Sequence, residues 1–569
     1  MNTWGSWGMA RGMNGRGRRS PKPLSLAGGW GRLSAAGYCW LLAGCDAQPP
    51  PPPPVVAEPQ AEVRVMPVVP EDVREQLLDG AVAVLARLED YDETSAFAQV
   101  FDRLSQWSHA ATVAGVKSAD DWQADPLFAA LPSRLREGTG PESLGSDVFD
   151  AATDVTALRD QRWLADIAAS ARGDAIDDLD IAVNLFCWTV RSLALVSDPP
   201  MTPTESTPGA RWFLPGEILL SGRASPAQRA WIFLELLRHA GLDGVMLATG
   251  DPKLGNLRAW IPVLITGGEA WLFEPTFGMP IAGPGGTGVA TARQAAADPA
   301  ILNRLSFSDR SYPVQAGDIA GLSVLVAADP WNLSRRMRAV DKQLVGSRAM
   351  ALVLDASALT KKAMEALGQA EESRSGLWEF PWEVLARRRG DPARVQTAIG
   401  RELAVLSVES TQATELAGRR GSRVVRPLYA ARLREFRGDL DGPDGAKMSY
   451  LAARPSRQTI AAAVKAAPPD QAEAVKRLFG QMKEDATYWL GVVTLAEGEN
   501  ATAADYLGRM TLEAAPDSRW TDAARVNLAQ ALEALGRTAE AIKLLREDAS
   551  PQRFGSRLRA EELEKTEKP

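Results

Sequence analysis

Hydrophobic residues recur at a helical spacing in the part of the chain that follows its proline-rich segment. Over residues 70–91 and 96–107, apolar side chains stand three and four positions apart, as they do along one face of a helix. The stretch 177–200 has the same period and ends in two prolines, which do not continue a helix. We therefore predict a helical N-terminal region over residues 68–171 and a further amphipathic helix from residue 177.

The pattern changes at Ser225, where a short helix is followed by three apolar runs. Ser225 suits a helix N-cap, with Pro226 at the first helical position and Gln228 completing a capping box. Gly241 suits the position just beyond the helix. The runs "GVMLAT", "LRAWIPVLI" and "EAWLFEP" have the length and composition of β-strands. Helices packed on a small antiparallel sheet make an α+β core, which we place over residues 172–320.

After residue 320 the pattern is again mostly helical. Residues 321–383 predict an α/β connecting region, with a helix in "NLSRRMRAVDKQLVG" and a strand in "AMALVLD". From residue 384 onward we expect helices to the end of the chain. The predicted fold class is therefore α+β, a mostly helical chain with one small sheet in its middle.

Two segments near the C-terminus repeat one another at an offset of 38 residues, from 490 to 528. Small residues at the matching points let two antiparallel helices pack closely. The pattern resembles the tetratricopeptide repeat (TPR), whose usual period is about 34 residues, and this implies TPR-like repeats and a tail over residues 483–569 that bind a protein or peptide partner. Two units cannot bury their own faces, so residues 384–482 are expected to supply helices, possibly as degenerate repeats. The matching residues are Leu490 with Leu528, Gly491 with Ala529, Gly498 with Gly536, and Ala503 with Ala541.

The first 45 residues have the features of a secretion signal. No acidic residue precedes Asp46, arginines make the start basic, and the uncharged run "LSAAGYCWLLAG" leads to Cys45, which together are typical of a signal peptide. The end of this run, "LAGC", resembles a bacterial lipobox and implies that Cys45 becomes the lipidated first residue of the mature chain. A simple signal peptide or an uncleaved anchor is the alternative.

Residues 46–67 hold six consecutive prolines, which favour an extended stem. With the lipobox, this stem indicates a protein of the cell envelope. We expect it to be lipid-anchored to a bacterial membrane and to face outside the cytoplasm.

Charge and cysteine content narrow the possible partners and chemistry. The net charge of −7 argues against nucleic acid as a partner, because phosphate binding needs a basic surface. Cys39, Cys45 and Cys187 form no disulfide framework, and no close spacing of Cys, His, Asp and Glu suggests zinc. Cys187 stands in an apolar helical stretch, so we predict a buried structural thiol. No metal and no cofactor is predicted.

The stretch 177–280 resembles the core of the transglutaminase-like superfamily. The resemblance rests on "DIAVNLFCWTV", "RAWIFLELLRHAGLD", "LRAWIPVLI" and "WLFEPTFGMP". It implies a papain/transglutaminase-like α+β core in which a cysteine at a helix start is the nucleophile, a histidine takes its proton and an aspartate orients the ring. Carried onto this sequence, the cysteine falls at Ser225 or Pro226, the histidine at Arg258 and the aspartate at Glu274. All three catalytic residue types differ.

The replacing residues do not form a catalytic set. Arg258 keeps its proton at ordinary pH and cannot act as a general base. His239 lies 14 residues beyond Ser225 on the same helix, about 21 Å away at 1.5 Å per residue, and His109 belongs to the N-terminal region. We instead hypothesise that Arg258 and Glu274, on adjacent strands, form an ion pair where the family's histidine and aspartate would meet.

The sequence thus predicts a pseudoenzyme, an inactive core that holds a peptide while the repeats bind a protein partner. Trp231, Trp260 and Trp271 are either lining residues of the inactive cleft or core residues. One alternative is a thiol or serine hydrolase with a rearranged active site at Cys187 or Ser225. Another is an envelope-assembly lipoprotein whose repeats act while the middle domain is a spacer.

Overall fold

The computed structural model describes the chain in six segments. The predicted signal peptide, Cys45 and the predicted proline-rich stem lie outside them. Within these segments, no helix combines the length and apolar character that a membrane span requires. The described residues are 71–113, 122–197, 211–250, 256–369, 374–416 and 419–567.

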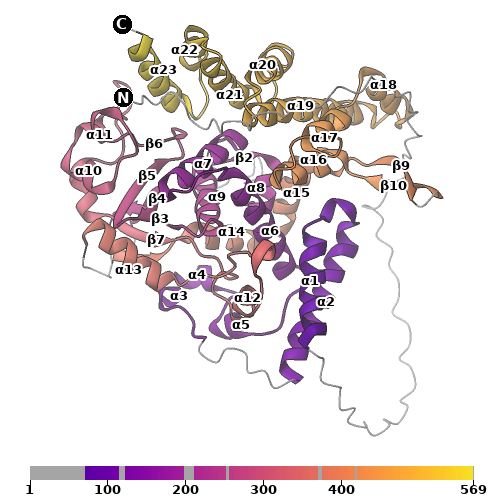
Figure 1. Ribbon diagram of the computed structural model, residues 1–569, viewed down its shortest axis with the longest axis horizontal. Helices are drawn as coiled ribbons and strands as arrows, with labels where there is room; N and C mark the ends of the chain where they lie inside the picture. The colour runs from indigo at the N-terminus through magenta and orange to yellow at the C-terminus, as the bar shows by residue number, and fades with distance from the viewer. Residues whose placement is uncertain are drawn as a thin grey trace.

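A mixed sheet of six strands lies toward one side of the protein, at the left of Figure 1. Its order is β6-β5-β4-β3-β7-β8, and all neighbours are antiparallel except β7 and β8. The α+β fold class is confirmed. The prediction of a purely antiparallel sheet is wrong, because β7 and β8 pair in parallel. The helices between these two strands form the crossover that parallel pairing needs. The strands are β3 (Asp243–Thr249), β4 (Arg258–Thr266), β5 (Glu269–Glu274), β6 (Met279–Pro280), β7 (Ser323–Val326) and β8 (Ser375–Leu377), so the sheet continues past residue 320.

The sheet separates two apolar cores. Met246, Leu264 and Phe273 face helices α7 and α9, whereas Val263 and Leu272 face α10 and α13. This alternation is the side-chain period of a strand, and it makes a three-layer arrangement. The helices are α7 (Asp178–Ser192), α9 (Pro226–His239), α10 (Ala292–Ala297) and α13 (Ala356–Leu367).

Helix α9 begins and ends where the sequence predicts. The Ser225 hydroxyl oxygen accepts from the Gln228 backbone N–H, and the Gln228 side chain accepts from the Ser225 backbone N–H, with Pro226 at the first helical position. Gly241, just beyond the helix, has a φ of +75°, which glycine adopts without strain. Local sequence chemistry therefore accounts for both ends of this helix.

The N-terminal region is helical, as predicted. Helices α1 and α2 pack on each other and on α6, and α3 lies against α13 and β8. The N-terminal helices therefore surround the α+β core instead of forming a separate unit. They are α1 (Glu71–Leu85), α2 (Glu93–Val113), α3 (Pro126–Ala130), α4 (Ser133–Arg136), α5 (Pro141–Gly145) and α6 (Thr153–Ala171).

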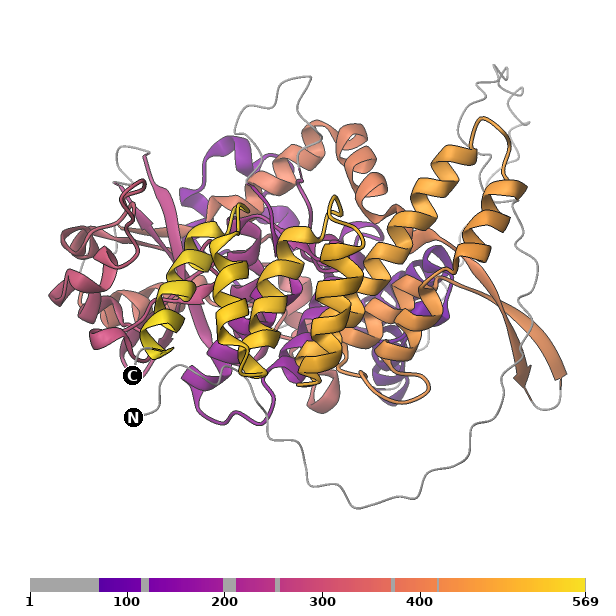
Figure 2. The same cartoon turned by 90° about the horizontal axis from the view of Figure 1, so that it is seen from above.

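Two segments differ from the prediction. The run "AMALVLD" forms no strand: Leu352 is buried, but its backbone N–H bonds to the Asp341 carboxylate, and β7 takes the place beside β3. The region expected to be wholly helical after residue 384 contains a β-hairpin of β9 (Ser410–Leu416) and β10 (Arg419–Val425). This hairpin projects from the body of the protein in Figures 1 and 2.

Helices α19 to α23 lie side by side in a layer along one side of the protein (Figure 2). Gly498 and Gly536 occupy matching turns with positive φ, and Ala503 and Ala541 are buried at matching points. Each of these two segments forms a helical hairpin. The helices from residue 379 onward are α14 (Glu379–Gly390), α15 (Pro392–Leu403), α16 (Pro427–Phe436), α17 (Ala446–Ala453), α18 (Arg457–Ala466), α19 (Ala472–Ala496), α20 (Asn500–Ala504) with a π-helical segment (Asp505–Glu513), α21 (Thr521–Ala534), α22 (Thr538–Arg546) and α23 (Arg553–Glu567).

One face of these C-terminal helices packs closely on the α+β core. A Cβ atom added at Gly555 of α23 would lie 1.9 Å from the Phe277 carbonyl oxygen, and one added at Gly222 would lie 2.1 Å from the Trp489 ring. Phe554 stacks on Phe277 with ring centroids 6.5 Å apart. The helix layer and the sheet therefore form one packed unit.

Replacing Gly555 by alanine is expected to push α23 away from the core. The new methyl group has no room beside the Phe277 carbonyl, so we expect a loss of about 1–3 kcal/mol in stability and a lower melting temperature in scanning calorimetry. Gly480→Ala on α19 is the matched control, because no atom lies within 4 Å of its added Cβ and alanine favours a helix by up to about 1 kcal/mol. Equal melting temperatures for Gly555→Ala and the wild type would contradict the close contact.

Candidate functional site

The start of α9, where the family resemblance places a nucleophile, is sealed. Ser225 is only 2% exposed, and its hydroxyl serves the cap described above. The Gln228 side-chain amide also donates to the Arg211 carbonyl oxygen at 2.8 Å. This serine is therefore held in place by packing and by the hydrogen bonds of the helix cap.

One turn further along, Arg229 occupies the interior. Its guanidinium donates to the carbonyl oxygens of Leu193 at 2.6 and 2.9 Å and of Pro275 at 3.0 Å, and to Gln552 Oε1 at 2.8 Å. No carboxylate among the described residues pairs with it, and burial lowers the pKa of Arg229 to about 9. Arg229 thus joins the end of α7, the loop after β5 and the segment before α23.

Neither histidine contacts Ser225 or Cys187. His239 shares a hydrogen bond with the Gln161 side chain at 2.7 Å and accepts at Nδ1 from the Ala351 backbone N–H at 3.2 Å. Burial lowers the pKa of His239 to about 3, so the ring is neutral. His109 is exposed on α2. No imidazole in the described part of the chain can accept a proton from that hydroxyl or thiol.

Glu274 is buried, but its partner is Tyr312. The Tyr312 hydroxyl donates to Glu274 at 2.5 Å, the Thr276 backbone N–H donates at 2.9 Å, and Trp260 Nε1 donates to the Tyr312 oxygen at 2.9 Å. Burial raises the pKa of Glu274. Arg258 is exposed at the start of β4, and no salt bridge joins it to Glu274. The predicted ion pair between Arg258 and Glu274 is therefore wrong.

Strand register explains why Arg258 and Glu274 do not meet. Val263 of β4 is opposite Leu272 of β5, so continuing this register places Glu274 level with Ile261. Arg258 then lies three residues further along β4, about 10 Å away at 3.3 Å per residue. The two strands are adjacent, as predicted, but the two charged residues are not.

The three tryptophans proposed for a cleft lie apart. Trp231 is 1% exposed and meets Phe380 edge-on. Trp260 bonds to Tyr312 on the opposite side of the sheet from α9, whereas Trp271 packs with the α9 side. None of them lines the cavity described next, so core packing is their role here.

A cavity of about 150 Å³ lies at the junction of the core and the C-terminal helices. Cys187 and Arg191 of α7 line one wall, and Asn527 and Gln530 of α21 line another. Asn527 donates to the Arg191 carbonyl oxygen at 3.1 Å and so joins the two walls. The cavity is partly open to solvent, and it is the place where both parts of the protein can contact one ligand.

The cavity favours binding over thiol chemistry. Burial raises the pKa of the Cys187 thiol to about 12, whereas a catalytic thiol needs a lowered pKa. Of the two arginines in the wall, Arg559 is paired with Glu533 at 2.6 Å and with Glu562 at 3.4 Å. Arg191 has no such carboxylate within reach among the described residues. Cys187 is half-buried and lines the cavity, so it is more accessible than the fully buried thiol that the sequence predicts.

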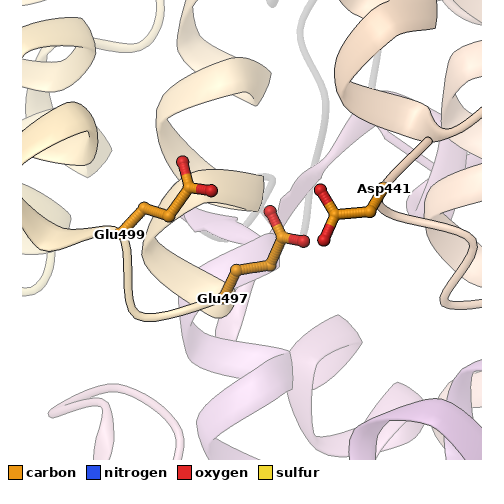
Figure 3. A group of neighbouring side chains, drawn as sticks. All are labelled: Asp441, Glu497 and Glu499. Carbon is orange, nitrogen blue, oxygen red and sulfur yellow. The ribbon is translucent and has the colours of Figure 1, made fainter. Parts of the chain in front are cut away.

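Away from the junction cavity, three carboxylates of the described residues lie close together. Asp441, Glu497 and Glu499 face a common point (Figure 3). Lys447 occupies this point, with its ammonium 2.5, 2.7 and 2.9 Å from the three side chains. Burial raises the pKa of Glu497 to about 7. We interpret this group as a structural ion-pair cluster.

Neither the buried Arg229 nor the half-buried Arg191 was singled out from the sequence. Arg229 lies four residues before Phe233, on the buried face of α9, and Arg191 lies four residues after Cys187 on α7. A charged residue in register with an apolar stripe is the signal that could have revealed them. The contact of Tyr312 with Glu274 could not be predicted in this way, because Tyr312 lies in a loop 38 residues further along the chain.

Comparison with known proteins identifies no relative: no protein-family model, no curated protein and no solved structure matches the chain. The transglutaminase-like and TPR-like resemblances therefore stay predictions.

Removing Arg258 and Glu274 singly and together tests the corrected geometry. Arg258→Ala should change stability by less than about 0.5 kcal/mol, as at other exposed positions. Glu274→Ala should cost about 1–3 kcal/mol, because it leaves the buried Tyr312 hydroxyl unpaired. In urea unfolding followed by tryptophan fluorescence, the two effects should add within about 0.5 kcal/mol. A coupling above about 1 kcal/mol would restore the ion-pair interpretation.

Proposed function

We propose that this protein is a non-catalytic binding protein of the bacterial cell envelope, anchored through lipid on Cys45. In this proposal a degenerate transglutaminase-like core and TPR-like helices together hold a peptide or protein partner. One observation carries it: the cavity at their junction is lined by both parts, and no imidazole among the described residues contacts a hydroxyl or thiol there.

The order of elements supports the core assignment. Helix α9 is followed by β3, β4 and β5, with Arg258 at the start of β4 and Glu274 at the end of β5. These are the places where the family's histidine and aspartate would stand. This order of elements occurs together with a buried start of α9 and a neutral His239 that is bonded elsewhere. A pseudoenzyme is expected to have these features.

The packing of the C-terminal helices refines where a partner can bind. In a repeat array, one helix face lines the binding surface. Here Trp489 of α19, Asn527 of α21 and Gly555 of α23 contact the core. The core therefore covers part of that face, and the cavity lies beside these contacts. This close packing also argues against the alternative in which the middle domain is only a spacer.

A thiol or serine enzyme is the rival that labelling can test. We expect no fluorophosphonate labelling of Ser225. Iodoacetamide should react with native Cys187 at pH 7 roughly a thousandfold more slowly than with the urea-unfolded chain, because thiolate is the reactive form and its pKa is about 12 in the fold. The native rate should rise about tenfold per pH unit between pH 7 and 10. Mass spectrometry of the peptide that contains Cys187 measures the rate of alkylation.

Fast, stoichiometric labelling at pH 7 that is lost in Cys187→Ala or Ser225→Ala would instead support the enzyme. The urea-unfolded protein provides the internal reference for the reagent.

Filling the cavity tests binding directly. Gln530 lines the cavity, so Gln530→Trp should weaken binding of fluorescent random hexapeptides by at least about tenfold, a loss of about 1.4 kcal/mol. Gln106→Trp, at an exposed site on α2, is the matched control and should bind as the wild type does. Fluorescence anisotropy measures affinity, and mass spectrometry should find the peptides intact. Undiminished binding by Gln530→Trp would place the site elsewhere.

A further inference from the structure

Two arginines, Arg191 and Arg559, line the junction cavity, and a third, Arg229, is bonded to the lining residue Gln552. Arg229 is saturated by carbonyl and amide oxygens, and Arg559 is paired with two glutamates. The Nε of Arg191 is shielded from solvent and has no hydrogen-bond partner. Among the described residues, no carboxylate forms a salt bridge with its guanidinium. Arg191 is thus a cationic group at the cavity wall whose Nε has no partner among the described residues.

The nearby acidic groups are engaged elsewhere. Glu435, whose charge acts on Arg191 through space, is held by Arg432 at 2.7 Å and by the Tyr450 hydroxyl. Glu533 is bonded to Arg559. Arg191 is half-buried at the wall of the cavity, with its Nε shielded from water, and a partly desolvated charge of this kind favours an anion as its partner. None of these carboxylates is therefore available to pair with Arg191.

The rest of the cavity indicates what carries that anion. Phe186, Phe277 and Met279 supply apolar surface. Gln552 accepts from Arg229 through its oxygen, which leaves its amide N–H groups as donors at the wall. At about 150 Å³, the cavity has room for one group of the size of benzene.

We infer that the cavity binds a carboxylate carried on a small apolar group, with the carboxylate paired to the Arg191 guanidinium. Guanidinium and carboxylate match as two parallel charge-assisted hydrogen bonds, and the apolar group fills the space beside Phe277. The inference rests on the proposed function, whose ligand chemistry it names. Either the C-terminal residue of a peptide or a free organic acid has this chemistry.

The test uses the full chain and ligands that differ only in their terminal group. The peptide Gly-Ser-Gly-Ala-Leu, labelled at its N-terminus, is prepared as the free acid and as the amide, alongside N-acetyl-leucine and its amide. The acid forms should bind at least about tenfold more tightly than the amides, in line with the strength of hydrogen bonds to charged groups. Arg191→Met should remove this difference.

Two controls separate binding from folding. Arg509→Met removes an exposed arginine that is paired with Asp505, and it should keep the wild-type preference. Arg191→Met should melt at or above the wild-type temperature, because it removes an unpaired charge from the interior. Arg191→Lys, which keeps a charge without the planar fork, should keep part of the preference.

Each result decides between the inference and the proposed function. If acid and amide peptides bind equally and Gln530→Trp weakens both, the binding function stands and the Arg191 inference is overturned. If N-acetyl-leucine binds through Arg191 while neither peptide binds, the inference stands with a free acid as ligand and the peptide-binding function fails. Failure of every acid to bind at millimolar concentration overturns the inference.

Discussion

The buried guanidinium of Arg229 is the interaction on which the arrangement of the molecule depends. A charge of this kind is tolerated in an interior only when hydrogen bonds replace its lost water. Its partners are the Leu193 carbonyl at the end of α7, the Pro275 carbonyl after β5 and the Gln552 side chain before α23. The carbonyls at the end of α7 also carry the negative end of that helix dipole. Displacing any of the three segments would leave the charge under-bonded, so all three are held in one geometry.

In that geometry the beginning of α9 is enclosed by packed chain. A nucleophile at a helix start needs an open approach and a base, whereas Ser225 is capped and buried beneath neighbouring chain. Phe186 of α7, Phe233 of α9 and Phe273 of β5 pack with centroids 4.9, 5.1 and 5.2 Å apart. The same helices that would bring a catalytic set together thus form a rigid apolar joint. The ligand-accessible space lies one layer further out, against the C-terminal helices.

Local chemistry explains which parts of the fold could be predicted from the sequence. The limits of α9 follow from Ser225, Pro226 and Gly241, and strands β3 to β5 follow from three short apolar runs bounded by turns. The parallel strand β8 could not be anticipated, because a strand of three residues gains its identity from the sheet edge it joins. The segment "AMALVLD" contributes buried residues to the core but forms no strand, because β7 already occupies the place beside β3 in the sheet.

The candidate site was less predictable because its contacts join distant parts of the chain. The Tyr312 partner of Glu274 and the β4–β5 register depend on tertiary packing, and a shift of three residues was enough to remove an ion pair that strand adjacency alone suggested. Arg229 and Gln552 are 323 positions apart. The sequence did contain one signal of this site that no motif includes. It is the charge of Arg191 and Arg229 within the apolar patterns of α7 and α9.

Arg191 and Arg229 show how similar positions can have opposite consequences. Both lie on helices at the junction, and burial lowers the pKa of each. Arg229 is surrounded by oxygens from three segments and so fixes them, whereas Arg191 faces the space those segments leave. A ligand that pairs with Arg191 would contact α7 and the C-terminal helices together, and would therefore bind only when they are docked. By mass action such a ligand stabilises the docked form, so the junction would connect binding with the integrity of the whole molecule.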